Sequence, residues 1–201
     1  IIGSNDANFD NIISKNNIID HKFKIYYNYS ISNFEFNSIN AGDAGTLICA
    51  KCENITVKDL NLSNYNQNGL LFFNTSNSSI SNVTISDNTY GLYLDLSSDN
   101  IISNITIENN ENCLKLDESS RNYISNIICN FGMDGLSIGD SSNNNFISNV
   151  SSVSFSSGFS ISDSLNNYVE MSNFSNNTNL GLSISYSHNI TLVNNNISNN
   201  F

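Results

Sequence analysis

The chain has 201 residues, of which 39% are hydrophobic and only 12% are charged, with neither Pro nor Trp. Its 18 acidic and 7 basic residues give a formal net charge of -11. Such a chain without a basic cluster is unsuited to nucleic acid or to an anionic membrane surface, and no apolar run approaches the ~20 residues of a spanning helix. We therefore expect no nucleic-acid partner and no membrane insertion within this segment.

The first 44 residues are the least regular part of the sequence. Residues 8–20 (NFDNIISKNNIID) look like the end of a repeat unit, whereas residues 21–44 are too long for one turn and contain an apolar alternation of their own. We interpret residues 21–44 as a strand-containing insertion or a widened repeat unit. Because the chain begins at Ile1 rather than Met, we expect it to be an excerpt of a longer or processed protein.

Residues 45–201 repeat a unit of about 22–23 residues. A small residue opens each unit, and two apolar residues in alternation follow it, such as Leu92 and Leu94 after Gly91. The openers of successive units are Gly69, Gly91, Cys113, Gly135, Gly158 and Gly181. Apolar residues at a period of two indicate a strand with one buried face.

Each unit continues with a polar corner, such as SSDN at 97–100, and then with two more short apolar segments. Three short strands in so short a unit cannot bury their apolar faces alone, but stacked units can. The sequence therefore predicts an all-β fold: one domain over residues 1–201, a single-stranded right-handed parallel β-helix like that of pectate lyase. We call each turn of it a coil, with the regular coils over 45–201.

One asparagine recurs between the second and third strand segments of successive units. This column contains Asn82, Asn104, Asn126 and Asn149. Asparagine tolerates the left-handed backbone of a tight corner, and stacked Asn side chains can hydrogen-bond from one coil to the next. We predict that these side chains turn inward as a buried ladder, which stabilises the corners and leaves these asparagines inaccessible to modification.

The repeated pattern Gly-Leu-x-Leu, then Ser-Ser-x-Asn-x-Ile-Ser-Asn-x-Thr-Ile, resembles that of the NosD-like right-handed β-helix family. The segment AGDAGTLICAKCENITVKDLNLSN (41–64) resembles the entry into the regular coils of that family. The resemblance implies a periplasmic or cell-surface solenoid of the carbohydrate-binding and sugar-hydrolase type, abundant in methanogenic archaea. The family's namesake is linked to copper-site maturation, but His21, His188, Met133 and Met171 form no cluster in this sequence.

A column of acidic residues follows the first strand of successive units. It comprises Asp95, Asp117, Glu118, Asp140 and Asp163. In register, these carboxylates would stand about 5 Å apart on one outer edge, where they would repel one another unless a cation or solvent screened them. They could bind Ca²⁺, act as paired carboxylates on a glycoside, or form a solvated acidic edge. We assign no catalytic residue, no metal ligand and no cofactor, with Ca²⁺ as the one candidate ion.

Four cysteines occur in the chain, and their spacing leaves several interpretations open. Cys49 and Cys52 form a lone CxxC, which could be redox-active or half of a zinc site, although no second pair completes it. Residues three apart on a strand point to opposite faces, which favours one buried and one near-surface thiol. Cys113 stands in the Gly column and Cys129 in an Ile column, so both read as small core residues. We expect a disulfide-poor protein.

Asn-x-Ser/Thr sequons are frequent and would be glycan acceptors in an exported protein. The candidates outside the predicted ladder include Asn28, Asn54, Asn61, Asn74, Asn173 and Asn189. Together these features favour a non-catalytic module of the cell surface, adhesin-like or part of a surface layer, with carbohydrate or envelope components as partners. The alternatives are a polysaccharide-active hydrolase or lyase, and a filament or sheath subunit that self-assembles through its open coil ends.

Overall fold

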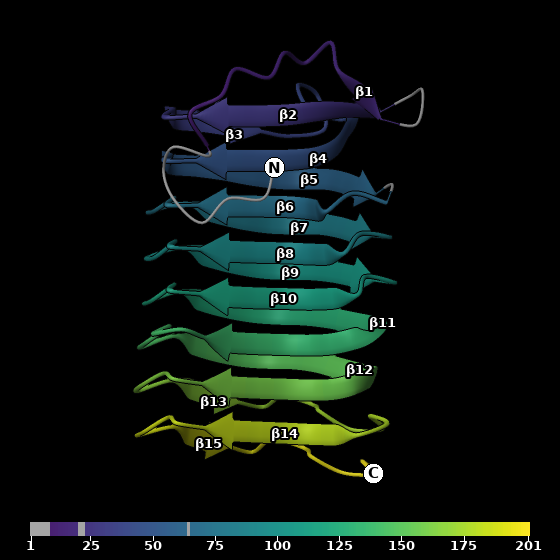
Figure 1. The fold of residues 1–201 in the computed structure, drawn as a ribbon, viewed down its shortest axis with the longest axis vertical. Helices are drawn as coiled ribbons and strands as arrows, with labels where there is room; N and C mark the ends of the chain where they lie inside the picture. Colours follow the sequence, from purple (N-terminus) through teal and green to yellow (C-terminus); the bar gives the residue numbers. More distant parts are fainter. Residues whose placement is uncertain (1–8, 20–22, 64) are drawn as a thin grey trace.

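The computed structural model describes residues 9–19, 23–63 and 65–201, which form one 15-stranded sheet wound into a solenoid (Figure 1). Strands paired between coils are parallel, and only β1 pairs antiparallel, with β2. The strands are β1 (Ile18–Ile19), β2 (Phe23–Tyr29), β3 (Ser32–Phe36), β4 (Ala44–Ala50), β5 (Glu53–Ser63), β6 (Asn68–Phe73), β7 (Ser79–Ser86), β8 (Tyr90–Asp95), β9 (Ile101–Glu108), β10 (Asn112–Asp117), β11 (Tyr123–Gly139), β12 (Phe146–Ser162), β13 (Tyr168–Glu170), β14 (Leu180–Ser185) and β15 (Thr191–Val193). None of the described residues belongs to a helix of the length and hydropathy that crossing a membrane requires.

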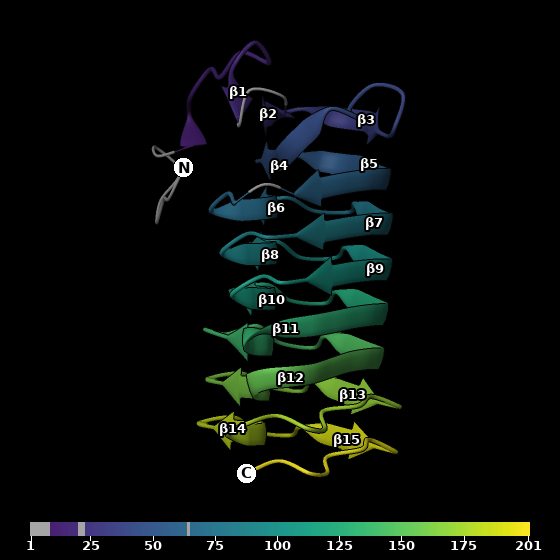
Figure 2. The ribbon, with the colours of Figure 1, turned by 90° about the vertical axis from the view of Figure 1, so that its right-hand side faces the viewer.

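Each coil contributes one strand to either side of the stack, as Figures 1 and 2 show from two directions. One side carries β2, β4, β6, β8, β10 and β14, and the other carries β3, β5, β7, β9, β13 and β15. The long strands β11 and β12 take part in both sides, because no break separates their two halves. The expected all-β parallel solenoid is confirmed, although the second and third predicted strands of a coil join into one bent strand, as in β9.

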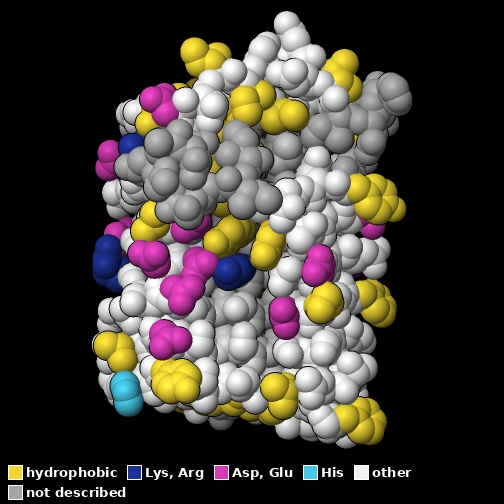
Figure 3. Space-filling view, in the orientation of Figure 1, with side chains coloured by type: hydrophobic (Ala, Val, Ile, Leu, Met, Phe, Trp, Pro, Cys, Tyr) yellow, Lys and Arg dark blue, Asp and Glu magenta, His cyan; other side chains and the backbone are white. Residues whose placement is uncertain are grey.

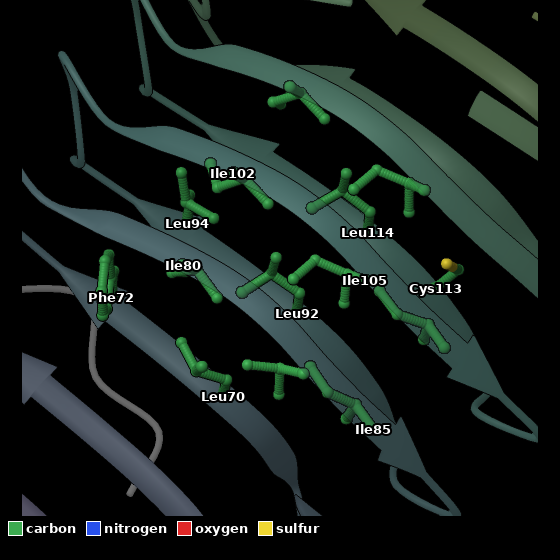
Figure 4. Close-up of a cluster of buried hydrophobic side chains, with 14 of the residues drawn as sticks. Leu70, Phe72, Ile80, Ile85, Leu92, Leu94, Ile102, Ile105, Cys113 and Leu114 are labelled. Carbon is green, nitrogen blue, oxygen red and sulfur yellow. The ribbon is translucent and has the colours of Figure 1, made fainter. Parts of the chain in front are cut away.

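The apolar residues of the repeat form stacked columns inside the solenoid (Figure 4). Leu94, Leu116 and Ile138 lie in one such column, since Leu116 pairs with both of the others, and all three are buried. Their sequence neighbours Lys115 and Ser137 point outward and are half-buried. The predicted strand register is therefore confirmed.

Every regular coil turns at residues with a left-handed backbone. In the coil of β8 and β9 these residues are Leu96, Asp99, Asn104 and Asn109, with φ between 52° and 61°. Asparagine and aspartate adopt this conformation at lower cost than most side chains, which explains why the corners are rich in them. All residues described with a positive φ are non-glycine, so the recurrent glycine of the repeat serves another purpose.

The predicted inward direction of the Asn82 column is wrong. Asn82, Asn104, Asn126 and Asn149 are exposed at an outer corner. Asn126 donates to Asn104 at 3.1 Å and Asn149 to Asn126 at 2.8 Å, so three of them form an external row, whereas Asn82 donates to Asp59. The left-handed φ directs each side chain to solvent, and the residue that follows, such as Ile105, turns inward instead.

The buried asparagine ladder lies one corner earlier in the coil. It consists of Asn100, Asn122, Asn145 and Asn167. The Asn122 Oδ1 accepts from the Asn100 backbone N–H at 3.0 Å, and the Asn122 Nδ2 donates to the Ser97 carbonyl at 3.0 Å. Each amide thus satisfies backbone groups of the neighbouring coils, which water cannot reach. A serine ladder, in which Ser97 N–H donates to Ser119 Oγ, does the same at the preceding corner.

Two expectations for the cysteines are also wrong. Cys113 and Cys129 form a disulfide across the core, because the glycine column and the isoleucine column are in contact inside each coil. Cys49 and Cys52 are both buried, at 0% and 2% exposure. A left-handed corner at Lys51, with φ 53°, breaks the strand alternation on which the opposite-face expectation depended.

The N-terminal residues are arranged differently from the expected end of a coil. Phe9 packs on the outer face of the solenoid, against Phe73 at 3.8 Å between ring centroids. Residues 23–36 then form the first coil through β2 and β3, which pair in parallel with β4 and β5, with a register shift between Lys24 and Ile25. Residues 1–8 and 20–22, with His21 among them, lie outside the described part.

Candidate functional site

Strands β8 and β10 place four candidate side chains together on the outer face of the solenoid. Tyr93 pairs with Lys115, and Asp95 pairs with Asp117. Because alternate residues of a strand share a face, all four point away from the core formed by Leu92, Leu94 and their partners. We call Tyr93, Asp95, Lys115 and Asp117 the Tyr93–Asp117 patch. Figure 3 shows acidic side chains gathered on this face.

Asp117 is the centre of the hydrogen bonds in the patch. Its Oδ2 accepts from the Tyr93 hydroxyl at 2.9 Å and from the Lys115 ammonium at 2.8 Å. The Lys115 Nζ also lies 5.1 Å from the centroid of the Tyr93 ring, and Tyr90 stacks on Tyr93 at 5.3 Å. Only 15% of the Asp117 side chain is exposed, and its Oδ1 is buried without a hydrogen-bond partner. One acceptor of the carboxylate is therefore held in place and the other is unpaired.

The environment drives the pKa values of neighbouring carboxyl groups apart. Burial, together with the charges of Asp117 and Glu118, raises the pKa of Asp95 to about 6. Burial also acts to raise the pKa of Asp117, but the interactions with Asp140 and Lys115 outweigh it and lower that pKa. The interaction with Asp117 raises the pKa of Asp140. Below pH about 6 the patch thus combines a neutral Asp95 with the anchored carboxylate of Asp117.

The five predicted acidic residues occupy two neighbouring columns rather than one. Asp95 and Asp117 end their strands, and Gly139 takes the equivalent position in the next coil. Glu118, Asp140 and Asp163 stand one position later, at the left-handed corner, with φ between 45° and 49°. The row is also less repulsive than expected, since Lys115 neutralises Asp117. The sequence contained a signal for this ion pair, because Lys115 and Asp117 are two residues apart on one strand and therefore share a face.

An apolar cover borders the patch on the side of the earlier coils. Phe9, Tyr27, Ile48, Leu71 and Phe73 form a second apolar cluster on the outer face, and Tyr93 packs against it. The Tyr27 hydroxyl donates to the Phe9 carbonyl, which fixes the N-terminal segment there. Sequence reasoning missed this cover, although the apolar outward positions of β4 and β6 were a signal for it, since a solvent-facing strand would be polar there.

Small hydroxyl side chains continue the face on the side of the later coils. Ser137, Ser160 and Ser183 follow Lys115 in the same outward column. The Tyr93–Asp117 patch therefore lies between an apolar wall and an open, flat floor of serines. Such a floor can accommodate an extended ligand along the solenoid axis, with hydrogen-bonding groups every ~4.8 Å.

The predicted glycan acceptors differ in accessibility. Asn54, Asn61, Asn74 and Asn189 are exposed, whereas Asn28 and Asn173 are half-buried. The sequons at Asn82, Asn104 and Asn149, expected to be buried, are exposed for the same reason as the outer row. Asn28 Nδ2 additionally donates to the Ile48 carbonyl at 3.3 Å, so its amide is partly engaged in the fold.

In the described part of the chain, no three His, Cys, Asp or Glu side chains gather in a way that could hold a metal ion. His188, Met133 and Met171 are each exposed, and the thiols of Cys113 and Cys129 are consumed in their disulfide. Cys49 and Cys52 are the remaining thiols, and the described residues bring no third such ligand to them.

Two family models match the chain. One, described as periplasmic copper-binding protein (NosD), matches residues 2–127. The other, described as right handed beta helix region, matches residues 100–201. No curated protein and no solved structure matches the chain. The first description points to a location in the periplasm or elsewhere outside the cytoplasm.

Proposed function

The chain belongs to the NosD family of right-handed β-helix proteins, and from this premise we propose that it is a non-catalytic carbohydrate-binding module of the cell envelope or surface. One observation carries the proposal: the Tyr93, Lys115 and Asp117 side chains form a fixed polar cluster on an open serine floor. Copper is not part of the proposal, because the described residues gather no set of three or more His, Cys, Asp or Glu ligands.

The chemistry of the patch favours sugar hydroxyls as ligands. The Lys115 ammonium, whose side chain is 29% exposed, can donate a hydrogen bond to a sugar hydroxyl, and the half-buried Asp95 carboxylate can accept one. The edges of Tyr90 and Tyr93 offer apolar contact to the ring carbons of a sugar. Because acidic groups dominate this face, it disfavours uronic acids and sulfated polymers. We therefore expect neutral envelope polysaccharides as ligands.

A glycan array followed by calorimetry tests this proposal. Lys115→Gln and Asp117→Asn should each weaken binding about 10-fold, since a lost hydrogen bond to a charged group is worth ~1.5–3 kcal/mol. Ser103→Ala, on β9 of the other side, is the matched control and should bind as the wild type does. Absence of binding to any neutral glycan, or equal affinities in all three variants, would overturn the proposal.

A polysaccharide hydrolase is the second candidate, and the divergent pKa values of the paired Asp95 and Asp117 favour it. A carboxyl group with a raised pKa beside an ionised one is the arrangement of an acid and a nucleophile. Carboxylates on adjacent strands stand at about the ~5 Å spacing of retaining enzymes. Release of reducing ends from neutral or acidic polysaccharides, abolished in Asp117→Ala, would favour this candidate over simple binding.

A further inference from the structure

Two unpaired cysteines both point into the interior at one corner of the second coil. Cys49 lies in β4, Cys52 lies just before β5, and both thiols are free and buried. Lys51 between them has a φ of 53°, which reverses the strand alternation so that both side chains point inward. In a regular strand the two cysteines of this CxxC would point to opposite faces, whereas here their side chains lie on the same side.

The two thiols are in contact and are not equivalent. Cys52 Sγ lies 3.3 Å from the Ala50 carbonyl oxygen and 3.7 Å from that of Asn28, and it can donate to either. A hydrogen bond from the Cys49 thiol lowers the pKa of Cys52, whereas burial raises the pKa of Cys49. Because the thiolate is the nucleophile in thiol–disulfide exchange, a corner that has already formed favours Cys52 as the attacking residue and Cys49 as the resolving one.

We propose that Cys49 and Cys52 form a second disulfide by exchange with a small-molecule disulfide or with the disulfide of a thiol oxidoreductase. The Cys52 thiolate attacks one sulfur of that disulfide, and one thiolate leaves. Cys49 then loses its proton and attacks Cys52 Sγ, which releases the second thiolate. Two protein thiols are oxidised, one external disulfide is reduced to two thiols, and both protons pass to solvent or to the leaving thiolates.

Oxidation does not leave the Ala50 carbonyl of this corner unsatisfied. The Ala50 carbonyl, which faces the Cys52 thiol, also accepts from the Ser30 N–H at 2.8 Å. The loss of the S–H donor therefore does not leave this buried carbonyl without a hydrogen bond. The pair forms while the chain folds, because the first coil covers it once Glu53 N–H has bonded to the Ile31 carbonyl at 3.1 Å.

An oxidising compartment supplies the necessary conditions. The family is described as periplasmic, and disulfides persist in such compartments. The same chain already contains the Cys113–Cys129 disulfide. That bond joins strands β10 and β11 across the core, whereas the second bond would close one corner near the apolar cover of the N-terminal segment.

The sequence provides a direct test, because Lys51 places a tryptic cleavage site between the two cysteines. The protein is reduced, unfolded and refolded in a glutathione redox buffer, and free thiols are then alkylated. Trypsin should release fragment 25–51 joined to fragment 52–58, and reductant should separate them. Fragment 59–115 joined to fragment 122–201 reports the Cys113–Cys129 bond in the same digest, and the oxidant is raised until that bond is complete.

The expected result is that most of fragment 25–51 is joined to fragment 52–58 under these conditions, and that Cys52→Ser abolishes the joined species. Recovery of both fragments as alkylated single peptides, while the Cys113–Cys129 bond is complete, would overturn the proposal. Fragment 25–51 joined to either fragment of the other pair would also overturn it. If Cys52→Ser does not fold, the wild-type digest with and without oxidant decides alone.

Discussion

At the scale of single residues, the corners of this solenoid depend on two kinds of asparagine with different roles. Exposed asparagines such as Asn104 and Asn126 adopt a left-handed backbone. Buried asparagines such as Asn122 use their amides to satisfy backbone groups of the neighbouring coils. The exposed asparagines adopt the left-handed conformation at a low free-energy cost. The buried asparagines form the hydrogen bonds that water would form with the backbone if the corner were exposed.

One substitution made at both kinds of position separates these roles. Asn122→Asp should destabilise the fold by at least ~2 kcal/mol, because it removes the donor to the Ser97 carbonyl and buries a charge. Asn126→Asp keeps the left-handed preference at an exposed site and should change stability by no more than ~0.5 kcal/mol. Urea unfolding at neutral pH measures both, and equal losses would contradict the distinction.

The Cys113–Cys129 disulfide occupies a position where the two preceding coils pair glycine with isoleucine. A Cβ at Gly91 would collide with Ile107, and a Cβ at Gly69 would collide with Ile85. Glycine therefore recurs at this position because the isoleucine side chain lies too close to leave room for a Cβ. A residue with a Cβ fits here only if a smaller residue replaces the isoleucine. Cysteine at both positions meets this condition.

This size relation predicts how the pair tolerates substitution. Reduction of the disulfide should cost about 3 kcal/mol, the value expected for a loop of this length. Cys129→Ile alone should be worse, because the new side chain meets the Cβ of Cys113. Cys129→Ile combined with Cys113→Gly restores the usual pair and should recover stability in reductant. Thermal melts with and without reductant test this, and equal melts for the single and double variants would contradict it.

At the scale of the strands, period-two alternation settles most facing directions, and the sequence was sufficient to predict them. Leu116 lies inside and Lys115 outside as expected. Two features were beyond such reasoning. The cover by Phe9 is a contact between segments far apart in sequence, and the inward turn of both Cys49 and Cys52 depends on a left-handed φ at Lys51, a residue with no special preference for it.

Strand β8 carries the carboxyl group whose ionisation depends most on the fold. The folded pKa of Asp95 is about 6, above the ~3.9 of an unfolded chain. Its contribution to stability is therefore complete below pH ~4 and is lost as the pH rises through about 6. Asp95→Asn should accordingly stabilise the protein at pH 8 by about 1 kcal/mol, discounted for partial exposure, and have little effect at pH 4.

Asp99 provides a control of opposite sign for this pH dependence. Hydrogen bonds of 2.7 Å from Arg121 lower the pKa of Asp99, so its contribution is present at neutral pH and is lost on acidification. Asp99→Asn should therefore weaken the protein slightly at pH 8 and leave it unchanged at low pH. Melting temperatures of both variants across this range should diverge in opposite directions, and a parallel response would contradict the assignment.

At the scale of the whole molecule, stacking in register places the charged residues of successive coils next to one another, as it does the apolar residues of the core. A chain with a net charge of -11 thus carries acidic rows along its corners, and adjacent like charges destabilise a sheet. The fold reduces this repulsion locally, through Lys115 beside Asp117, Arg121 beside Asp99 and Lys58 beside Glu35. The corner row of Glu118, Asp140 and Asp163 extends beyond these pairs.

Ions should therefore stabilise the solenoid by screening and not by occupying a site. CaCl₂ and NaCl at equal ionic strength should raise the melting temperature equally, and EDTA should have no effect, because exposed charges respond to the Debye length and not to the identity of the ion. The main carboxylate of the patch already has Lys115 and Tyr93 as partners, so a cation would have to displace them. A rise specific to Ca²⁺ and lost in Asp117→Asn would show that the row binds the ion, because screening alone cannot distinguish the two salts.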